Sequence, residues 1–340
     1  MSRRIVISGL GAVCPRATGP AALWERFSQG DVGPPSSLAE RIPDAAFAKQ
    51  SAQLRHMDRL GRIALTATTL SIEDAGPGNP LQTGIAFGSS YGCLPTNAEY
   101  LEAILERGGR YGNPVVFQNT VTNAATGYIS MVHDLRGPTA TLCSGHAAGL
   151  EALRFGCQQI EEGQAERMVV VGADTLSPML LAGIALPEGM RVSEAACALV
   201  LEEHTRALTR GAHRHAEVLG TGHRGGSLTN QAHTLARAVR DAMHLARIEP
   251  EQLGAVFSCA SGRGDFDGWE QRGLHEALGA HAAKVPVSCP KDVLGESFST
   301  AGMLAVVLAT RALDKGCALV TALGGEGSAL AVVLRGGAHD

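Results

Sequence analysis

Short, continuously apolar runs alternate with longer helical patterns along the whole chain, and this alternation limits the possible folds more than any other feature. Runs rich in Val, Ile and Ala without polar alternation are typical of strands buried on both faces of a sheet. The predicted strands are residues 4–8, 83–88, 140–143, 168–171, 198–202, 216–220, 254–259, 285–288, 317–321 and 329–334. The clearest predicted helices are residues 58–75, 147–162, 234–247 and 300–315. The sequence therefore predicts an α/β protein in which helices cover buried sheets.

The same order of elements occurs twice. Residues 140–174 follow the order strand, small-residue loop, long helix, glycine-bearing turn and strand, and residues 285–325 follow it again. A duplicated unit built from strand–helix crossovers predicts two similar halves that pack together. We place the boundary in the charged stretch around Gly211, which gives an N-terminal half of residues 1–210 and a C-terminal half of residues 211–340.

Composition narrows the functional classes. The chain has 340 residues, of which 45% are hydrophobic, so it is long enough to bury a large core. A net charge of -4 provides neither the basic surface of a nucleic-acid-binding protein nor a polybasic membrane patch. No run approaches the roughly 18 apolar residues that span a bilayer, and Gly9 and Gly11 interrupt the apolar run that follows Arg3 and Arg4. We expect a cytoplasmic protein without nucleic-acid or membrane partners.

Cysteine and histidine spacing argues against a bound metal. The eight cysteines include no Cys-x-x-Cys pair, and most lie in apolar segments, as expected for small buried side chains in a reducing compartment. His213, His215 and His223 form a loose cluster that has no cysteine or acidic ligand at metal-binding spacing. We therefore predict neither a metal nor another cofactor.

Many segments, in order along nearly the whole chain, resemble the β-ketoacyl-ACP synthases, or ketosynthases. The matching segments are residues 3–33, 54–76, 83–92, 114–149, 166–174, 196–212, 291–302 and 324–334. The resemblance implies the thiolase fold, in which two related halves form five layers in the order α/β/α/β/α and the chain assembles as a dimer. This expectation agrees with the internal duplication.

The resemblance also indicates which residues occupy the catalytic Cys–His–His positions of a ketosynthase. The family's cysteine lies eight residues after a Gly-Pro pair, and counting from residues 137–138 leads to His146. The first histidine position falls on Ser261 and the second on Glu296, whereas the family's lysine is retained as Lys291. Imidazole cannot carry an acyl chain as a stable thioester, and a carboxylate repels the malonyl group and its enolate. We therefore predict that this chain alone does not catalyse condensation.

Chain-length factors are family members that lack the cysteine and pair with an active ketosynthase, and this chain resembles them. The turn that carries a gating Phe in the family has Gly325 at that position. We predict a chain-length-factor-like subunit of a type II polyketide or fatty-acid-type synthase. The implied partners are an intact ketosynthase, as a heterodimer, and an acyl carrier protein that reaches the complex.

The resemblance places the contact with that partner on two segments. Five residues are expected to form an edge strand that pairs with the partner: Thr139, Ala140, Thr141, Leu142 and Cys143. Three residues of the preceding segment are expected to line or cap the partner's acyl tunnel: Phe117, Gln118 and Thr120.

Other functions stay open on the sequence alone. His146 and Glu296 are candidates for acyl transfer, cyclisation or hydrolysis, and Cys143 is a candidate for a displaced nucleophile. An acyl-binding homodimer is a third possibility. Residues 262–268 carry two carboxylates, and we interpret them as a turn beside the altered site rather than an acid–base pair.

Overall fold

The computed structural model describes residues 3–33, 38–47, 55–184, 187, 189–260 and 264–337. The strands of the main sheet system are β1 (Ile5–Cys14), β2 (Ala17–Thr18), β4 (Thr83–Gly88), β5 (Thr139–Leu142), β6 (Arg167–Asp174), β8 (Ala195–Glu203), β9 (Ala216–Gly225), β10 (Leu253–Phe257), β11 (Val287–Ser288), β12 (Gly316–Leu323) and β13 (Ser328–Gly336). A separate pair consists of β3 (Ala39–Glu40) and β7 (Val192–Ser193). All ten predicted strands are present.

The helices surround these strands. The α-helices are α1 (Pro20–Ser28), α3 (Arg59–Ala75), α4 (Leu94–Arg107), α5 (Pro114–Phe117), α6 (Ala124–His133), α7 (Ala148–Glu161), α8 (Pro178–Gly183), α9 (His204–Thr209), α10 (Gln231–Ala246), α11 (Gly264–Leu278), α12 (Pro290–Leu294) and α13 (Ser299–Ala312). The 3-10 turns are η1 (Asp44–Phe47), η2 (Pro80–Gln82), η3 (Gly109–Tyr111), η4 (Gly145–Ala147), η5 (Leu228–Asn230), η6 (Pro250–Gln252) and η7 (Gly279–Ala283).

The strand pairing confirms the internal duplication. The N-terminal half has the strand order β1-β8-β6-β4-β5, and the C-terminal half has the order β9-β13-β12-β10-β11. In each half the first two pairings are antiparallel and the last two are parallel. Ile5 to Ile7 of β1 pair with Val218 to Ala216 of β9, which joins the two halves into one continuous sheet. The position of the boundary at residue 210 stays a prediction.

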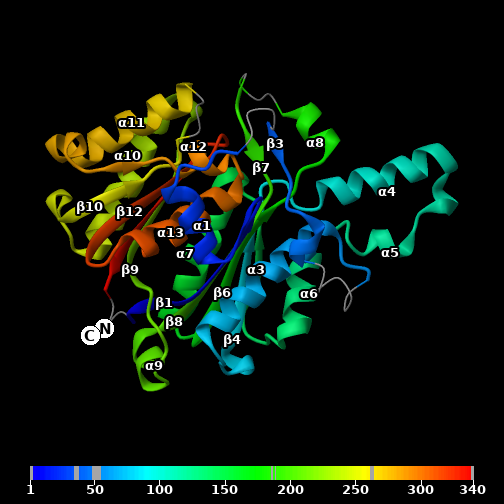
Figure 1. Ribbon diagram of the computed structural model, residues 1–340, viewed down its shortest axis with the longest axis horizontal. Helices are drawn as coiled ribbons and strands as arrows, with labels where there is room; N and C mark the ends of the chain where they lie inside the picture. The colour runs from blue at the N-terminus through cyan, green and yellow to red at the C-terminus, as the bar shows by residue number, and fades with distance from the viewer. Residues whose placement is uncertain are drawn as a thin grey trace.

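The layers follow the predicted α/β/α/β/α order. Helices α3 and α6 cover the outer face of the N-terminal sheet, and α10 and α11 cover the outer face of the C-terminal sheet. Helices α7 and α13 lie between the N-terminal and C-terminal parts of the continuous sheet, and they contact each other (Figure 1). Helices α4 and α5 project from the body of the molecule as an arm, visible in Figure 1.

Strand β1 is longer than the predicted residues 4–8 because its glycines do not end it. A Cβ atom on Gly9 would lie 2.1 Å from the carbonyl oxygen of Ser71, and one on Gly11 would lie 2.0 Å from that of Ala67. Both carbonyls belong to α3. The glycines therefore allow α3 to pack directly on the backbone of the strand.

The central helices approach each other through small residues, and this contact positions the candidate site. A Cβ atom on Gly149 of α7 would lie 2.2 Å from the carbonyl oxygen of Ser299, at the start of α13. A Cβ atom on Gly302 would lie 2.8 Å from Cγ of Leu150. Because the two helices lie so close at this point, the residues that precede them also meet.

Candidate functional site

Three of the four residues expected at the ketosynthase catalytic positions meet where α7 and α13 begin. His146 lies in the η4 turn before α7, Glu296 lies two residues before the N-cap of α13, and Lys291 lies in α12. These three side chains line one small chamber. Ser261 lies outside the described residues, and the chain reaches it directly after the segment that follows β10. The expected position of Ser261 is therefore untested.

A buried ion pair fills the chamber. Lys291 Nζ lies 2.7 Å from Glu296 Oε2, and their side chains are only 9% and 2% exposed. Burial by itself favours the neutral Glu296 carboxyl, but Lys291, His146 and the backbone N–H of Phe298 outweigh it and lower its pKa. Burial also opposes the charge of Lys291, but Glu296 raises the pKa of the ammonium group overall. The cation is therefore engaged by the protein's own carboxylate.

A second buried carboxylate closes the opposite wall. Glu270 of α11 accepts hydrogen bonds from Ser258 Oγ at 2.6 Å, the Cys259 backbone N–H at 2.9 Å and Thr321 Oγ1 at 2.5 Å. Burial, followed by the Glu270 charge, raises the pKa of the Cys259 thiol well above its ordinary value. Cys259 is the sulfur among the described residues that line the chamber. Because its thiol stays protonated at neutral pH, it cannot replace the missing nucleophile.

The backbone at the start of α13 is held in a rarely populated conformation. Phe298 has φ 54° and ψ −121°, although it is not a glycine, and its side chain is 1% exposed. Its ring packs edge-on against Tyr91 at 4.9 Å and lies 5.6 Å from the His146 ring. These contacts fix Phe298 beside His146.

Asp174 ties the two halves together beneath the site. This residue ends β6, and its carboxylate accepts hydrogen bonds from Ser89 Oγ at 2.8 Å and from Ser299 Oγ at 2.5 Å. Its carboxylate also accepts the backbone N–H groups of Ser90 and Tyr91 at 2.9 and 3.1 Å. Burial raises the pKa of Asp174 to about 6 despite these bonds. The carboxylate therefore anchors the first turn of α13 to the N-terminal sheet.

The chamber is nearly closed. Its free volume is about 10 Å³, which is at the lower limit for one water molecule. A malonyl or acyl thioester cannot enter such a space without moving Phe266, Lys291 or Glu296, which line it. The residues expected at the ketosynthase catalytic positions, His146, Lys291 and Glu296, therefore line a chamber with almost no free volume.

Gly325 opens a wider mouth above the chamber. The mouth has a volume of about 390 Å³ and is lined by Gly325, His146 and two aromatic residues of α11, Phe266 and Trp269. A Cβ atom on Gly325 would lie 3.5 Å from Phe266 Cζ, which is an ordinary van der Waals contact, so the Phe266 ring lies directly over Gly325. The sequence prediction of a turn at residues 262–268 was wrong from Gly264 onward, because α11 begins there. Because of that error, Phe266 and Trp269 were not predicted as site residues, although their spacing of three residues is typical of a helix.

The residues predicted for the partner lie away from the chamber. Strand β5 is at the edge of the sheet, paired with β4 on one side, and Cys143 follows it and is exposed. Burial raises the pKa of the Cys143 thiol, so it is not an activated nucleophile. Phe117 is 56% exposed at the end of α5, Gln118 follows it, and Thr120 Oγ1 donates to the Phe117 carbonyl. Cys143 is not among the described residues that line the chamber with His146.

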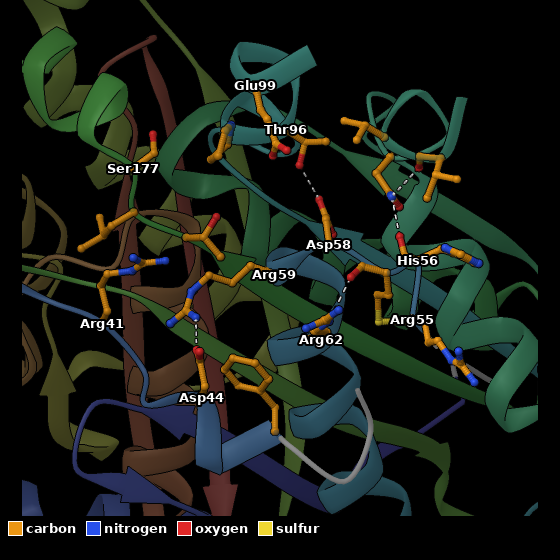
Figure 2. A pocket seen from close by; sticks show the side chains of 18 of the residues that line it. Arg41, Asp44, Arg55, His56, Asp58, Arg59, Arg62, Thr96, Glu99 and Ser177 are labelled. Carbon is orange, nitrogen blue, oxygen red and sulfur yellow. Dashed lines mark hydrogen bonds and ion pairs between the residues drawn. The ribbon is translucent and has the colours of Figure 1, made fainter. Parts of the chain in front are cut away.

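A second, larger cleft of about 730 Å³ separates the α4–α5 arm from the start of α3 (Figure 2). Asp58 caps α3 by accepting the Gly61 N–H, and it also accepts Thr96 Oγ1 of α4 at 2.9 Å. Arg59 pairs with Asp44 across the cleft floor, at 2.6 Å. The Asp58–Thr96 hydrogen bond holds the arm against the body, and His146 is not among the residues that line this cleft.

One buried atom beside that cleft lacks a hydrogen-bond partner. Asn119 donates its side-chain amide to the His56 carbonyl at 2.6 Å and to the Val115 carbonyl at 3.3 Å. Its Oδ1 atom accepts no hydrogen bond from any described residue. A buried acceptor without a partner costs free energy, so the base of the arm is an incompletely satisfied part of the isolated chain.

No group of three or more metal-ligating side chains is found in the part of the chain that the structure describes. Among its described helices, none is both long enough and apolar enough to cross a membrane.

Comparison with known proteins identifies the family. The β-ketoacyl synthase N-terminal domain matches residues 28–200, and the β-ketoacyl synthase C-terminal domain matches residues 212–322. The chain therefore belongs to the β-ketoacyl synthase family. It is 30% identical to a Streptomyces coelicolor protein named as a polyketide β-ketoacyl synthase 2, over 93% of this chain and 84% of that protein. It is 25% identical to a 3-oxoacyl-[acyl-carrier-protein] synthase 2 of Coxiella burnetii, over 92% and 86%.

Solved structures confirm the fold. The ishigamide ketosynthase/chain length factor superposes with a TM-score of 0.86 at 21% identity, over 99% of this chain and 100% of that chain. A type II polyketide synthase acyl-carrier protein in complex with its hexaketide-bound ketosynthase gives a TM-score of 0.87 at 19% identity, also over 99% and 100%. The thiolase-like architecture predicted from the sequence is therefore correct.

Proposed function

We propose that this chain is a non-condensing, chain-length-factor-like subunit of a type II polyketide or fatty-acid-type synthase. In this proposal it forms a heterodimer with an intact ketosynthase and shapes that partner's acyl tunnel. The ketosynthase carries out condensation on substrates delivered by an acyl carrier protein. The names of the relatives, which include polyketide β-ketoacyl synthases, support the pathway class.

One observation carries the proposal. The site expected to hold a thioester has no activated sulfur among its described residues, and it has almost no free volume. His146 occupies the nucleophile position, and the chamber beside it has a free volume of about 10 Å³. The buried Lys291–Glu296 pair would have to break before an acyl group could enter. Breaking such a pair costs about 3–5 kcal/mol, so this chain lacks both the nucleophile and the space for condensation.

The apolar surface of the arm and of helix α6 supports the proposal that the chain binds a large protein partner. Residues 111–132 contain no charged side chain. Eight of the sixteen exposed large hydrophobic side chains in the described part of the chain lie between residues 101 and 132: Leu101, Leu105, Tyr111, Val115, Phe117, Val121, Met131 and Val132. The part of this surface formed by residues 111–132 is apolar and uncharged, which is typical of a protein interface.

Strand β5 continues this surface and is the proposed pairing edge. Its residues pair with β4 on one side, and the opposite edge has no neighbouring strand among the described residues. Thr141 Oγ1 lies 2.8 Å from Thr126 Oγ1, which fixes β5 against α6. A rigid, unpaired edge favours the addition of a strand from a partner.

Phe117, Gln118 and Thr120 are the proposed tunnel residues, because they lie on the same uncharged surface. The Phe117 ring packs 5.6 Å from Tyr100, which holds it at the arm's exposed face. A fixed ring in a tunnel limits the volume that a growing chain can fill. We expect Phe117→Ala to lengthen the product made by the complex.

The test uses the purified chain, an intact ketosynthase encoded beside it, and malonyl-loaded acyl carrier protein. We expect condensation by the complex, loss of condensation when the partner's cysteine is replaced, and none from this chain alone. The chain should elute with the ketosynthase in size-exclusion chromatography. Extension of a primer by this chain alone would refute the proposal, as would a stable homodimer that ignores the ketosynthase.

A pair of matched substitutions, one on the proposed interface and one away from it, tests where the ketosynthase binds. Met131 in α6 and Leu245 in α10 are exposed by 68% and 60%, on opposite flanks of the molecule. Met131→Glu should weaken the complex by roughly tenfold or more, because the charge would be buried at the proposed interface. Leu245→Glu should leave the affinity unchanged.

A chemically active His146 is the alternative that these assays separate. The proximity of His146 to Glu296 favours it, because a carboxylate can orient an imidazole base. If His146→Ala abolished the product while the heterodimer stayed intact, acyl transfer, cyclisation or hydrolysis at His146 would replace the proposed role.

A further inference from the structure

The mouth above the closed chamber is a built pocket rather than a gap. Its volume of about 390 Å³ is within the range of small-molecule sites. Tyr91, which follows β4, and His146 form one wall, and Phe266 and Trp269 of α11 form another. Glu326, in the turn between β12 and β13, lies at the rim.

The rings of the mouth are held by one another. Phe266 and Trp269 have ring centroids 5.0 Å apart at 56°, and Tyr91 and His146 have centroids 6.5 Å apart at 65°. Tyr91 is also packed edge-on against the buried Phe298, which fixes its position. Aromatic pairs with such geometry present ring faces and edges to a third ring. The mouth therefore offers a preformed aromatic surface.

The charges around the mouth are negative. Glu326 is exposed at the rim, and Glu296 and Glu270 lie in the chamber below. The nearby cation, Lys291, is paired with Glu296 at 2.7 Å. None of the described residues that line the mouth is a Lys or an Arg. Among the described residues, an anionic ligand would therefore meet carboxylates and no free lysine or arginine.

We propose that this mouth binds a flat, unsaturated ligand that carries no negative charge, such as an aromatic ring or a conjugated segment. Stacking on Trp269 and Phe266 supplies the affinity, and the carboxylate of Glu326 excludes anions. The chamber floor, closed by the Lys291–Glu296 pair, prevents the ligand from going deeper. The site binds its ligand without a covalent step, and it acts whether or not the chain has a ketosynthase partner.

The test is titration calorimetry with two probes of nearly the same shape, the neutral 2-naphthamide and the anionic 2-naphthoate. The neutral amide should bind at one site per chain, and the carboxylate should bind at least roughly tenfold more weakly, as expected for like-charge repulsion. Glu326→Gln should remove most of that difference, because the rim then carries no charge. Glu326 is exposed, so this variant is expected to fold.

Two tryptophan variants locate the binding site. Trp269→Ala should weaken naphthamide binding by roughly tenfold, because it removes a stacking face, whereas Trp269→Phe should retain most of the affinity. Trp24 lies in α1, is not among the residues lining the mouth, and is the other tryptophan of the chain. Trp24→Phe should bind naphthamide as the unaltered chain does, and it leaves Trp269 as a fluorescence reporter.

Several outcomes would overturn the inference. These are absence of naphthamide binding at millimolar concentration, equal affinity for naphthamide and naphthoate, and unchanged binding in a folded Trp269→Ala variant. Circular dichroism of each variant checks the fold, and Glu326→Gln keeps the charge argument testable if Trp269→Ala does not fold. None of these outcomes bears on whether the chain pairs with a ketosynthase.

Discussion

At the residue scale, the altered site is stabilised by groups that would be costly if unpaired. Glu296, Glu270 and Asp174 are each no more than 2% exposed, and each accepts hydrogen bonds or pairs with a cation. A buried carboxylate is tolerated only when its partners replace the lost water. Glu296, the residue expected at the second histidine position, is thus accommodated as part of a packed interior.

Removal of one partner from the buried pair should destabilise the fold. Lys291→Met leaves Glu296 uncompensated, and we expect the free energy of unfolding to fall by about 3–5 kcal/mol. Urea titration followed by circular dichroism measures it. As a control, Glu166→Gln breaks the exposed pair with Arg206, whose side chain is 64% exposed, and should cost less than about 1 kcal/mol. Equal effects of the two variants would contradict the assignment of a buried pair.

Asp174 should contribute a distinct pH dependence. Its pKa in the folded chain is raised to about 6 from an ordinary value of 3.8, mainly by burial. The folded state therefore binds the proton more tightly, so the contribution to stability is largest below pH 4 and is lost as pH rises through 6. The difference in unfolding free energy between the unaltered chain and Asp174→Asn should fall by roughly 2–3 kcal/mol over that range. A difference that is flat or rises with pH would contradict this result.

At the element scale, glycines control how closely helices pack. Two glycines of β1 admit α3, and Gly149 and Gly302 admit the α7–α13 contact. The latter contact brings His146 and Phe298 within 5.6 Å, ring to ring. The geometry of the site therefore depends on helix spacing as much as on the side chains that line it.

Gly9→Ala tests this dependence. Its Cβ atom would lie 2.1 Å from the carbonyl oxygen of Ser71, and the resulting overpacking should destabilise the chain by about 1–3 kcal/mol. Gly127 in α6 is the control, because a Cβ there meets nothing within 4 Å. Gly127→Ala should be neutral or stabilise by up to about 1 kcal/mol. Thermal denaturation of the isolated chain distinguishes the two, and a tolerated Gly9→Ala would argue against close packing.

At the scale of the whole molecule, the two halves share one interior. The β1–β9 pairing, the Asp174–Ser299 hydrogen bonds and the α7–α13 contact all cross between them. Such extensive contacts oppose independent unfolding of the halves. The arm is different, since α4 contains no buried residue.

Each half carries one tryptophan, which allows the coupling to be measured. Trp24 lies in α1 and Trp269 in α11. In the Trp269→Phe and Trp24→Phe variants, the remaining fluorescence reports the unfolding of one half. For each variant, the urea midpoint from tryptophan fluorescence is compared with the midpoint from the circular dichroism of the same variant. We expect the fluorescence midpoint to have the same relation to the circular-dichroism midpoint in both variants, so that the two halves unfold together. Separate midpoints would mean that the halves unfold independently.

Much of the architecture was predictable from the sequence because strand and helix periodicity are local properties. The ten predicted strands and the four predicted long helices are all present, and repetition of their order indicated two related halves. The family resemblance also predicted that a histidine, His146, stands at the position of the nucleophilic cysteine, because this prediction depends only on a count from the Gly-Pro pair. The length of β1 was missed, because Gly9 and Gly11 continue the strand where α3 packs closely on it. The start of α11 was missed, because residues 262–268 were interpreted as a turn.

The sequence by itself determined the family and the doubled strand order, and by the family resemblance it predicted His146 at the nucleophile position, since each depends on residue identity along a short stretch. Only the tertiary structure decided that the chamber is closed, that Lys291 is engaged by Glu296, and that Phe266 lies over Gly325. The chamber is lined by residues that range from His146 to Leu323 in the sequence, and packing between segments so far apart leaves no local pattern.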